Sequence, residues 1–95
     1  MFIIEDEAHA EWYGEFTTKE EAIFELRARS LISWDQVPNI CPCMSWRTCG
    51  RKYSILEFNT SVEPWEERSR TPVLSVSSKE VKWEEDFAPP LPSSA

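Results

Sequence analysis

Glycine is nearly absent from this chain of 95 residues, in which Gly14 and Gly50 are the only two. Nucleotide-binding loops need several closely spaced glycines, because the backbone must approach the phosphates without a side chain in between. The sequence therefore excludes the ordinary P-loop and dinucleotide-binding motifs. Histidine is scarce as well: the single one, His9, lies in an acidic segment, and we expect a solvated turn residue there rather than a general base.

Long apolar runs are also missing. The first apolar stretch ends at Ile4, which is short of the ~7–15 apolar residues of a signal-peptide core. No run approaches the ~18 apolar residues of a membrane span. These absences predict a cytoplasmic protein. In that compartment the cysteines should remain thiols, and their odd number argues against a closed set of disulfides.

Positively charged residues are outnumbered: the chain has 10 Lys and Arg residues and 17 Asp and Glu residues, so its formal net charge is −7. Such a field repels phosphate groups, so we expect no nucleic-acid and no membrane partner. A basic protein is the kind of partner that this charge would attract. A role in solubility alone explains the same balance.

One segment carries a clear helix signal. Thr18 and Glu21 have the spacing of a capping box, and Glu25 and Arg29 stand four residues apart in the favourable order. The pattern predicts a helix at about residues 18–31. Its predicted apolar face contains Ala22, Ile23, Leu26 and Ser30 and is broadened by Phe24, Ala28 and Leu31.

Segments rich in aromatic and β-branched residues predict strands on both sides of this helix. Residues 2–5 and 11–16 precede it and should pair as a hairpin. After it, residues 52–59 carry apolar side chains on both faces, which predicts a central strand. Residues 72–77 and 80–84 should form a closing hairpin.

Two other segments predict irregular structure. Residues 33–50 show no period, and residues 61–71 are charged and interrupted by a proline, so we expect a long loop and a connection there. The predicted fold class is α+β, with one helix packed on a mainly antiparallel sheet of four to five strands. The elements follow the order β-β-α-(long loop)-β-β-β. We expect one domain at residues 1–87 and a disordered, Pro/Ser-rich tail at residues 88–95.

Three cysteines, Cys41, Cys43 and Cys49, lie in the long predicted loop. A structural zinc site takes four nitrogen or sulfur ligands, usually in two closely spaced pairs. Here the fourth ligand would have to be His9, far upstream in the sequence. Without a second pair, the sequence favours three packed thiols over a metal site, and we expect no metal and no cofactor.

The loop also suggests phosphatase chemistry and redox chemistry. Cys41 and Arg47 have the spacing of the tyrosine-phosphatase signature, but Pro42 removes a backbone amide that would bind the phosphate. A disulfide between Cys41 and Cys43 would be strained and easily reduced, which keeps a redox switch open as an alternative. Basic residues beside Cys49 would lower the pKa of its thiol if they faced it.

The five tryptophans fall into two groups. Trp12 and Trp83 lie on predicted strands and should pack in the core. Trp34, Trp46 and Trp65 lie in loops, where a large aromatic side chain either covers a sheet face or anchors an interface.

We interpret the chain as a non-catalytic protein-interaction module, by analogy with small acidic immunity and antitoxin proteins or adaptors. The alternative is a thiol-based redox or metal sensor, or a cysteine-dependent enzyme, centred on the loop with the three cysteines. The residues proposed for interaction are Trp34, Trp46, Arg47, Arg51 and Trp65.

Overall fold

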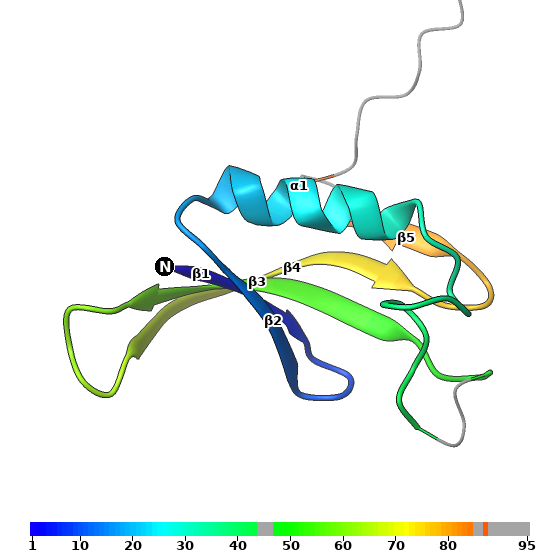
Figure 1. The fold of residues 1–95 in the computed structure, drawn as a ribbon, viewed down its shortest axis with the longest axis horizontal. Coiled ribbons are helices and arrows are strands. Elements are labelled where there is room, and N and C mark those ends of the chain that lie inside the picture. Colours follow the sequence, from blue (N-terminus) through cyan, green and yellow to red (C-terminus); the bar gives the residue numbers. More distant parts are fainter. Residues whose placement is uncertain (44–46, 85–86, 88–95) are drawn as a thin grey trace, which may run out of the picture.

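The structure is a computed structural model, and it describes residues 1–43, 47–84 and 87. The predicted tail and Trp46 lie outside these residues. The elements are β1 Phe2–Asp6, β2 Glu11–Phe16, α1 Lys19–Ser30, β3 Arg51–Asn59, β4 Glu66–Val76 and β5 Val81–Trp83. The strands pair in the order β2-β1-β3-β4-β5 as one antiparallel sheet, and α1 lies along one face of it (Figure 1). The predicted α+β class and the order of the elements are confirmed.

Helix α1 begins as the capping box predicts. The Thr18 hydroxyl accepts a hydrogen bond from the Glu21 backbone N–H at 3.2 Å, which satisfies one of the unpaired amides of the first turn. The predicted pair of Glu25 and Arg29 also forms, with 3.2 Å between Oε1 and Nε. In the described part of the chain, no helix has the length and apolar character needed to cross a membrane.

The apolar face of α1 is narrower than the sequence suggested. Ala22 and Leu26, one turn apart, are both fully buried against the sheet. Phe24 and Leu31 are 74% and 89% exposed, so the predicted broadening of the face to these two residues is wrong. A single helix on a sheet contacts it along one stripe of residues spaced three or four apart, and these two side chains lie off that stripe.

Strand β3 is the central strand, as predicted, and both of its faces are buried. Tyr53 and Ile55 pack in the core under α1, whereas Leu56 and Phe58 belong to a smaller cluster on the opposite face. This division follows from the alternation of side chains along a strand.

Strand β4 begins earlier than the sequence predicted. Residues 66–71, expected to form a connection, pair with β3 from Glu66 opposite Asn59 to Thr71 opposite Ile55. Their apolar content is low because residues 66–70 are exposed to solvent. Backbone pairing with β3, which leaves little trace in the side-chain pattern, extends the sheet here.

Strand β2 contains a bulge that decides which face its aromatic residues occupy. The pairing with β1 shifts after Tyr13, between the pairs Ile4–Tyr13 and Phe2–Phe16, and Gly14 in the bulge has a φ of 67°. A Cβ atom at Gly14 would lie 2.8 Å from the Phe16 ring, so this position requires glycine. Trp12 is 54% exposed on the face opposite α1, so its predicted core position is wrong, whereas Trp83 packs against the core as predicted.

Truncation of Leu26 tests the position of the helix. We expect Leu26→Ala to lower the free energy of unfolding by about 2–5 kcal/mol, because it leaves a cavity between α1 and the sheet. The matched control Phe24→Ala removes an exposed side chain and should change it by less than about 0.5 kcal/mol. Urea denaturation followed by circular dichroism measures both values, and similar losses in the two variants would contradict this packing.

Candidate metal and thiol site

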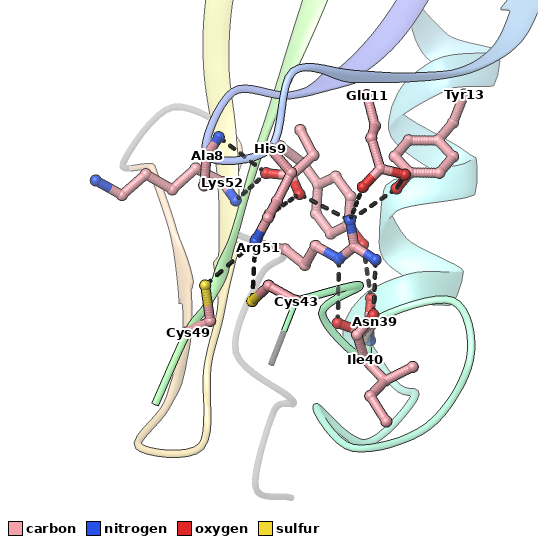
Figure 2. Close-up of polar contacts among 12 residues, drawn as sticks. Ala8, His9, Glu11, Tyr13, Asn39, Ile40, Cys43, Cys49, Arg51 and Lys52 are labelled. Carbon is pink, nitrogen blue, oxygen red and sulfur yellow. Dashed lines mark hydrogen bonds and ion pairs between the residues drawn. The ribbon is translucent and has the colours of Figure 1, made fainter. Parts of the chain in front are cut away.

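A buried ion pair lies beside the cysteine loop. Arg51, the first residue of β3, is 4% exposed, and its Nη1 lies 2.9 Å from Oδ2 of Asp6, which is fully buried. The same nitrogen contacts Glu11 Oε1 at 3.1 Å and donates to the Tyr13 hydroxyl at 2.8 Å (Figure 2). Burial alone would raise the pKa of Asp6, but hydrogen bonds from Arg51 and the Lys52 backbone N–H hold this pKa below its ordinary value.

The other nitrogens of Arg51 hold the loop that follows α1. Nε and Nη2 donate to the backbone carbonyls of Asn39 and Ile40 at 3.2 and 2.6 Å. Nδ2 of the buried Asn39 donates in turn to the carbonyls of Arg29 and Ile32 at 2.7 and 2.8 Å, which caps the end of the helix. The loop leading to the first cysteine is therefore fixed to both α1 and β3. Sequence reasoning assigned no role to Asn39, because this residue lies well beyond the end of the helix and only the fold of the loop brings its side chain back to it.

His9 occupies the turn between β1 and β2 and faces the cysteines. Its Nδ1 lies 2.6 Å from Asp6 Oδ2, and its Nε2 lies 3.2 Å from Cys49 Sγ and 3.8 Å from Cys43 Sγ (Figure 2). The ionised Asp6 accepts a hydrogen bond from Nδ1–H, and in this neutral tautomer the lone pair of Nε2 points towards the sulfurs. Burial lowers the pKa of His9, but hydrogen bonds to Cys43 and Asp6 outweigh it and raise this pKa above its ordinary value.

The expectation that His9 is a solvated turn residue is wrong. Only 12% of its side chain is exposed, and both ring nitrogens have partners. The pairing of β1 with β3 brings the turn next to the residues that precede β3, and the Glu7 N–H donates to the Lys52 carbonyl at 2.8 Å. The histidine that is distant in sequence is thus a neighbour of the cysteines in space.

Three ligand atoms meet at this point. Nε2 of His9 and the sulfurs of Cys41 and Cys49 all lie within 4.8 Å of one another. Ligand atoms around one tetrahedral zinc ion are about 3.3–3.8 Å apart, as follows from Zn–N and Zn–S bond lengths of about 2.0–2.3 Å. The contacts of 3.2 and 3.8 Å from His9 to the sulfurs of Cys49 and Cys43 bracket that range. Three of the four ligands thus lie close together, and Cys43, which is not part of the group within 4.8 Å, contacts it through His9 Nε2.

The electrostatics of Cys41 do not favour a catalytic thiol. Its side chain is buried, and burial together with the neighbouring Cys49 raises the pKa of the Cys41 thiol to about 11. A nucleophilic cysteine requires a lowered pKa. The phosphatase chemistry that the spacing of Cys41 and Arg47 suggested is therefore opposed by the structure as well as by Pro42.

The residues proposed for interaction have different environments. Trp34 packs against the core under α1, and Trp65 packs on the cluster of the opposite face, so both cover the sheet. Arg47 is exposed. The surface role expected for Arg51 is wrong, because this side chain is buried in the ion pair with Asp6.

The chain was compared with protein-family models, with curated proteins and with solved structures, and none of them matches it.

Replacement of Arg51 tests the ion pair independently of any metal. In the presence of a chelator, we expect Arg51→Met to lower the free energy of unfolding by about 3–5 kcal/mol, because Asp6 would remain buried without its counter-charge. Arg27 is an exposed arginine of α1, and the control Arg27→Met should change stability by no more than about 0.5 kcal/mol. Denaturant titrations of both variants measure the difference, and equal stability of the two would refute the role of Arg51.

Proposed function

We propose that this protein is a small non-catalytic metal-binding module that holds one zinc ion with His9, Cys41, Cys43 and Cys49. The observation that supports it best is the position of His9, which presents Nε2 to the thiols while the buried Asp6 holds Nδ1. Histidines that bind metals almost always donate their other ring N–H to a carboxylate or a carbonyl in this way. Packed thiols alone would not require such an oriented imidazole.

The ligand chemistry favours zinc over other ions. Thiolates and imidazole are soft or borderline ligands that suit zinc and copper(I), whereas magnesium and calcium prefer oxygen. A set of three cysteines and one histidine is a closed tetrahedral set of the structural kind. Since four protein ligands leave no position for a water or a substrate, the proposed module is non-catalytic.

Bound zinc would join three segments of the chain at one end of the sheet. His9 belongs to the turn after β1, Cys41 and Cys43 belong to the long loop, and Cys49 directly precedes Gly50 and β3. The core between α1 and the sheet contains none of these four side chains. Metal binding would therefore stabilise the conformation of the loop, whereas the core would form without it. The conformation of this surface loop would then depend on whether the ion is bound.

Metal titration of the reduced protein tests the proposal. We expect one zinc ion per chain and, with cobalt(II), the absorption of tetrahedral thiolate coordination. Cys49→Ser and His9→Gln should each abolish tight binding. Asp6→Asn should weaken it about 10–100-fold, because the orienting carboxylate of His9 is lost.

Asp35 offers the matched control, because it is a carboxylate of the same loop that contacts Ser33 and not His9. Asp35→Asn should bind zinc like the unchanged protein. Circular dichroism verifies that each variant is folded. If the folded protein takes up no zinc, or if Cys49→Ser keeps full affinity, the proposed site is wrong; preferential copper(I) binding would change the assigned ion.

A second candidate function, binding of a basic protein, is favoured by the face of the sheet opposite α1. Trp12, Phe58 and Trp65 form a row there, with ring centroids 5.3 Å apart for the first pair and 6.1 Å for the second. Trp12 is 54% exposed. Tryptophans with a large exposed surface are typical anchors of protein interfaces.

The charges on this face indicate the chemistry of the partner. Carboxylates of Glu5, Glu7 and Glu67 surround the guanidinium of Arg70, with 2.7 Å to Glu7 and 2.8 Å to Glu67. This face therefore holds a guanidinium with several carboxylates beside the exposed ring of Trp12. An exposed aromatic ring also attracts cations. Together with the net charge of −7, this favours a partner rich in arginine or lysine.

An NMR titration with an arginine-rich peptide tests this second function. We expect the indole N–H signals of Trp12 and Trp65 to shift, while that of Trp34 on the helix side stays in place. A glutamate-rich peptide of equal length is the control and should shift none of them. Trp12→Ala should weaken the arginine-rich peptide severalfold; an unchanged affinity, or equal shifts at Trp34, would refute the assignment.

A further inference from the structure

We infer that the proposed zinc site is also a redox switch, in which a peroxide joins Cys41 and Cys49 in a disulfide and thereby releases the zinc ion. This inference rests on the proposed function, since it names how the same site is regulated. It goes further because it assigns different roles to the three cysteines.

The geometry selects the pair that reacts. The sulfurs of Cys41 and Cys49 belong to the group of ligand atoms that lie within 4.8 Å of one another. A disulfide requires about 2.05 Å between the sulfurs, which a small movement of the loop provides from such a starting distance. Cys41 and Cys43 are separated only by Pro42, and a disulfide across this short segment would be strained. The third cysteine, Cys43, remains a thiol.

Accessibility sets the order of the steps. Cys41 is only 8% exposed, whereas Cys49 is half-buried and follows the exposed Thr48. Of the two cysteines in this pair, Cys49 is therefore the one that an oxidant from solvent meets first. Hydrogen peroxide is uncharged, so the net charge of −7 does not repel it.

The reaction balances with one molecule of peroxide. The thiolate of Cys49 attacks one peroxide oxygen, so that an S–O bond forms, the O–O bond breaks, and the hydroxide that leaves is protonated by the buffer. In the zinc-loaded protein Cys41 would be bound as a thiolate. This thiolate then attacks the sulfur of the sulfenic acid, the S–S bond forms, the S–O bond breaks, and the second hydroxide that leaves is protonated by the buffer. Two thiolates are oxidised by two electrons in total, and the peroxide is reduced to two molecules of water.

Loss of two thiolates leaves the ion with His9 and Cys43. A structural zinc site needs four ligands, so two do not retain it. Among the residues that the structure describes, no cysteine or methionine belongs to the core under α1 or to the ion pair of Arg51 with Asp6, and both should persist in the oxidised protein. The switch would thus change the metal content and the loop while it leaves the fold in place.

Treatment of the zinc-loaded protein with one equivalent of hydrogen peroxide tests the inference. We expect one zinc ion released per chain, measured with a chromogenic chelator, and a loss of two hydrogen atoms by mass spectrometry. Peptide mapping should identify the disulfide between Cys41 and Cys49. Dithiothreitol should restore zinc binding. In the variant Cys43→Ser the same disulfide between Cys41 and Cys49 should form. In the variant Cys41→Ser the oxidation should end with the sulfenic acid of Cys49, because no disulfide with Cys41 can form.

The outcomes separate this inference from the proposed function, because zinc loading is measured first. A protein that never takes up zinc overturns both. A protein that binds zinc but retains it after oxidation overturns only the switch. A disulfide between Cys41 and Cys43, or conversion of Cys49 to sulfinic acid without any disulfide, also overturns the switch as stated.

Discussion

The structure depends on one buried ion pair, formed by Asp6 at the end of β1 and Arg51 at the start of β3. A buried pair of this kind adds little net stability by itself, but removal of either partner leaves an uncompensated charge inside the protein. The guanidinium also holds Glu11 and Tyr13 of β2 and the loop carbonyls of Asn39 and Ile40. One side chain therefore connects the first hairpin, the long loop and the central strand.

The same ion pair gives the candidate site its geometry. Oδ2 of Asp6 contacts both Arg51 and Nδ1 of His9, and Oδ1 accepts from the Ala8 and Lys52 amides at 3.0 Å each. With so many partners the carboxylate has no freedom to rotate, and it fixes the plane and the tautomer of the imidazole. The thiols approach from the other side of the ring, on a segment that the same arginine holds. The candidate site thus combines a rigidly held imidazole with thiols on a loop.

Local patterns predicted the parts of the fold that depend on neighbours in sequence. The capping box of Thr18 and Glu21 and the double-sided apolar pattern of β3 both led to the correct elements. The pattern failed where pairing with a distant strand decides the conformation. Residues 66–71 are charged, and only their register with β3 makes them a strand. The bulge at Gly14 lets Tyr13 and Phe16, three residues apart, both pack against the core under α1, and it can be recognised only from the pairing between β1 and β2.

By itself, the sequence determined the α+β class, the helix at its capping signal, the acidic charge and the concentration of three thiols in one loop. It also named the four residues that would be needed for a zinc site. Only the tertiary structure decided that they meet, because antiparallel pairing of β1 with β3 carries His9 from the first turn to the residues before the central strand. Contacts between residues far apart in the chain arise from strand pairing and buried charge, and neither is encoded in the spacing of the residues that they bring together.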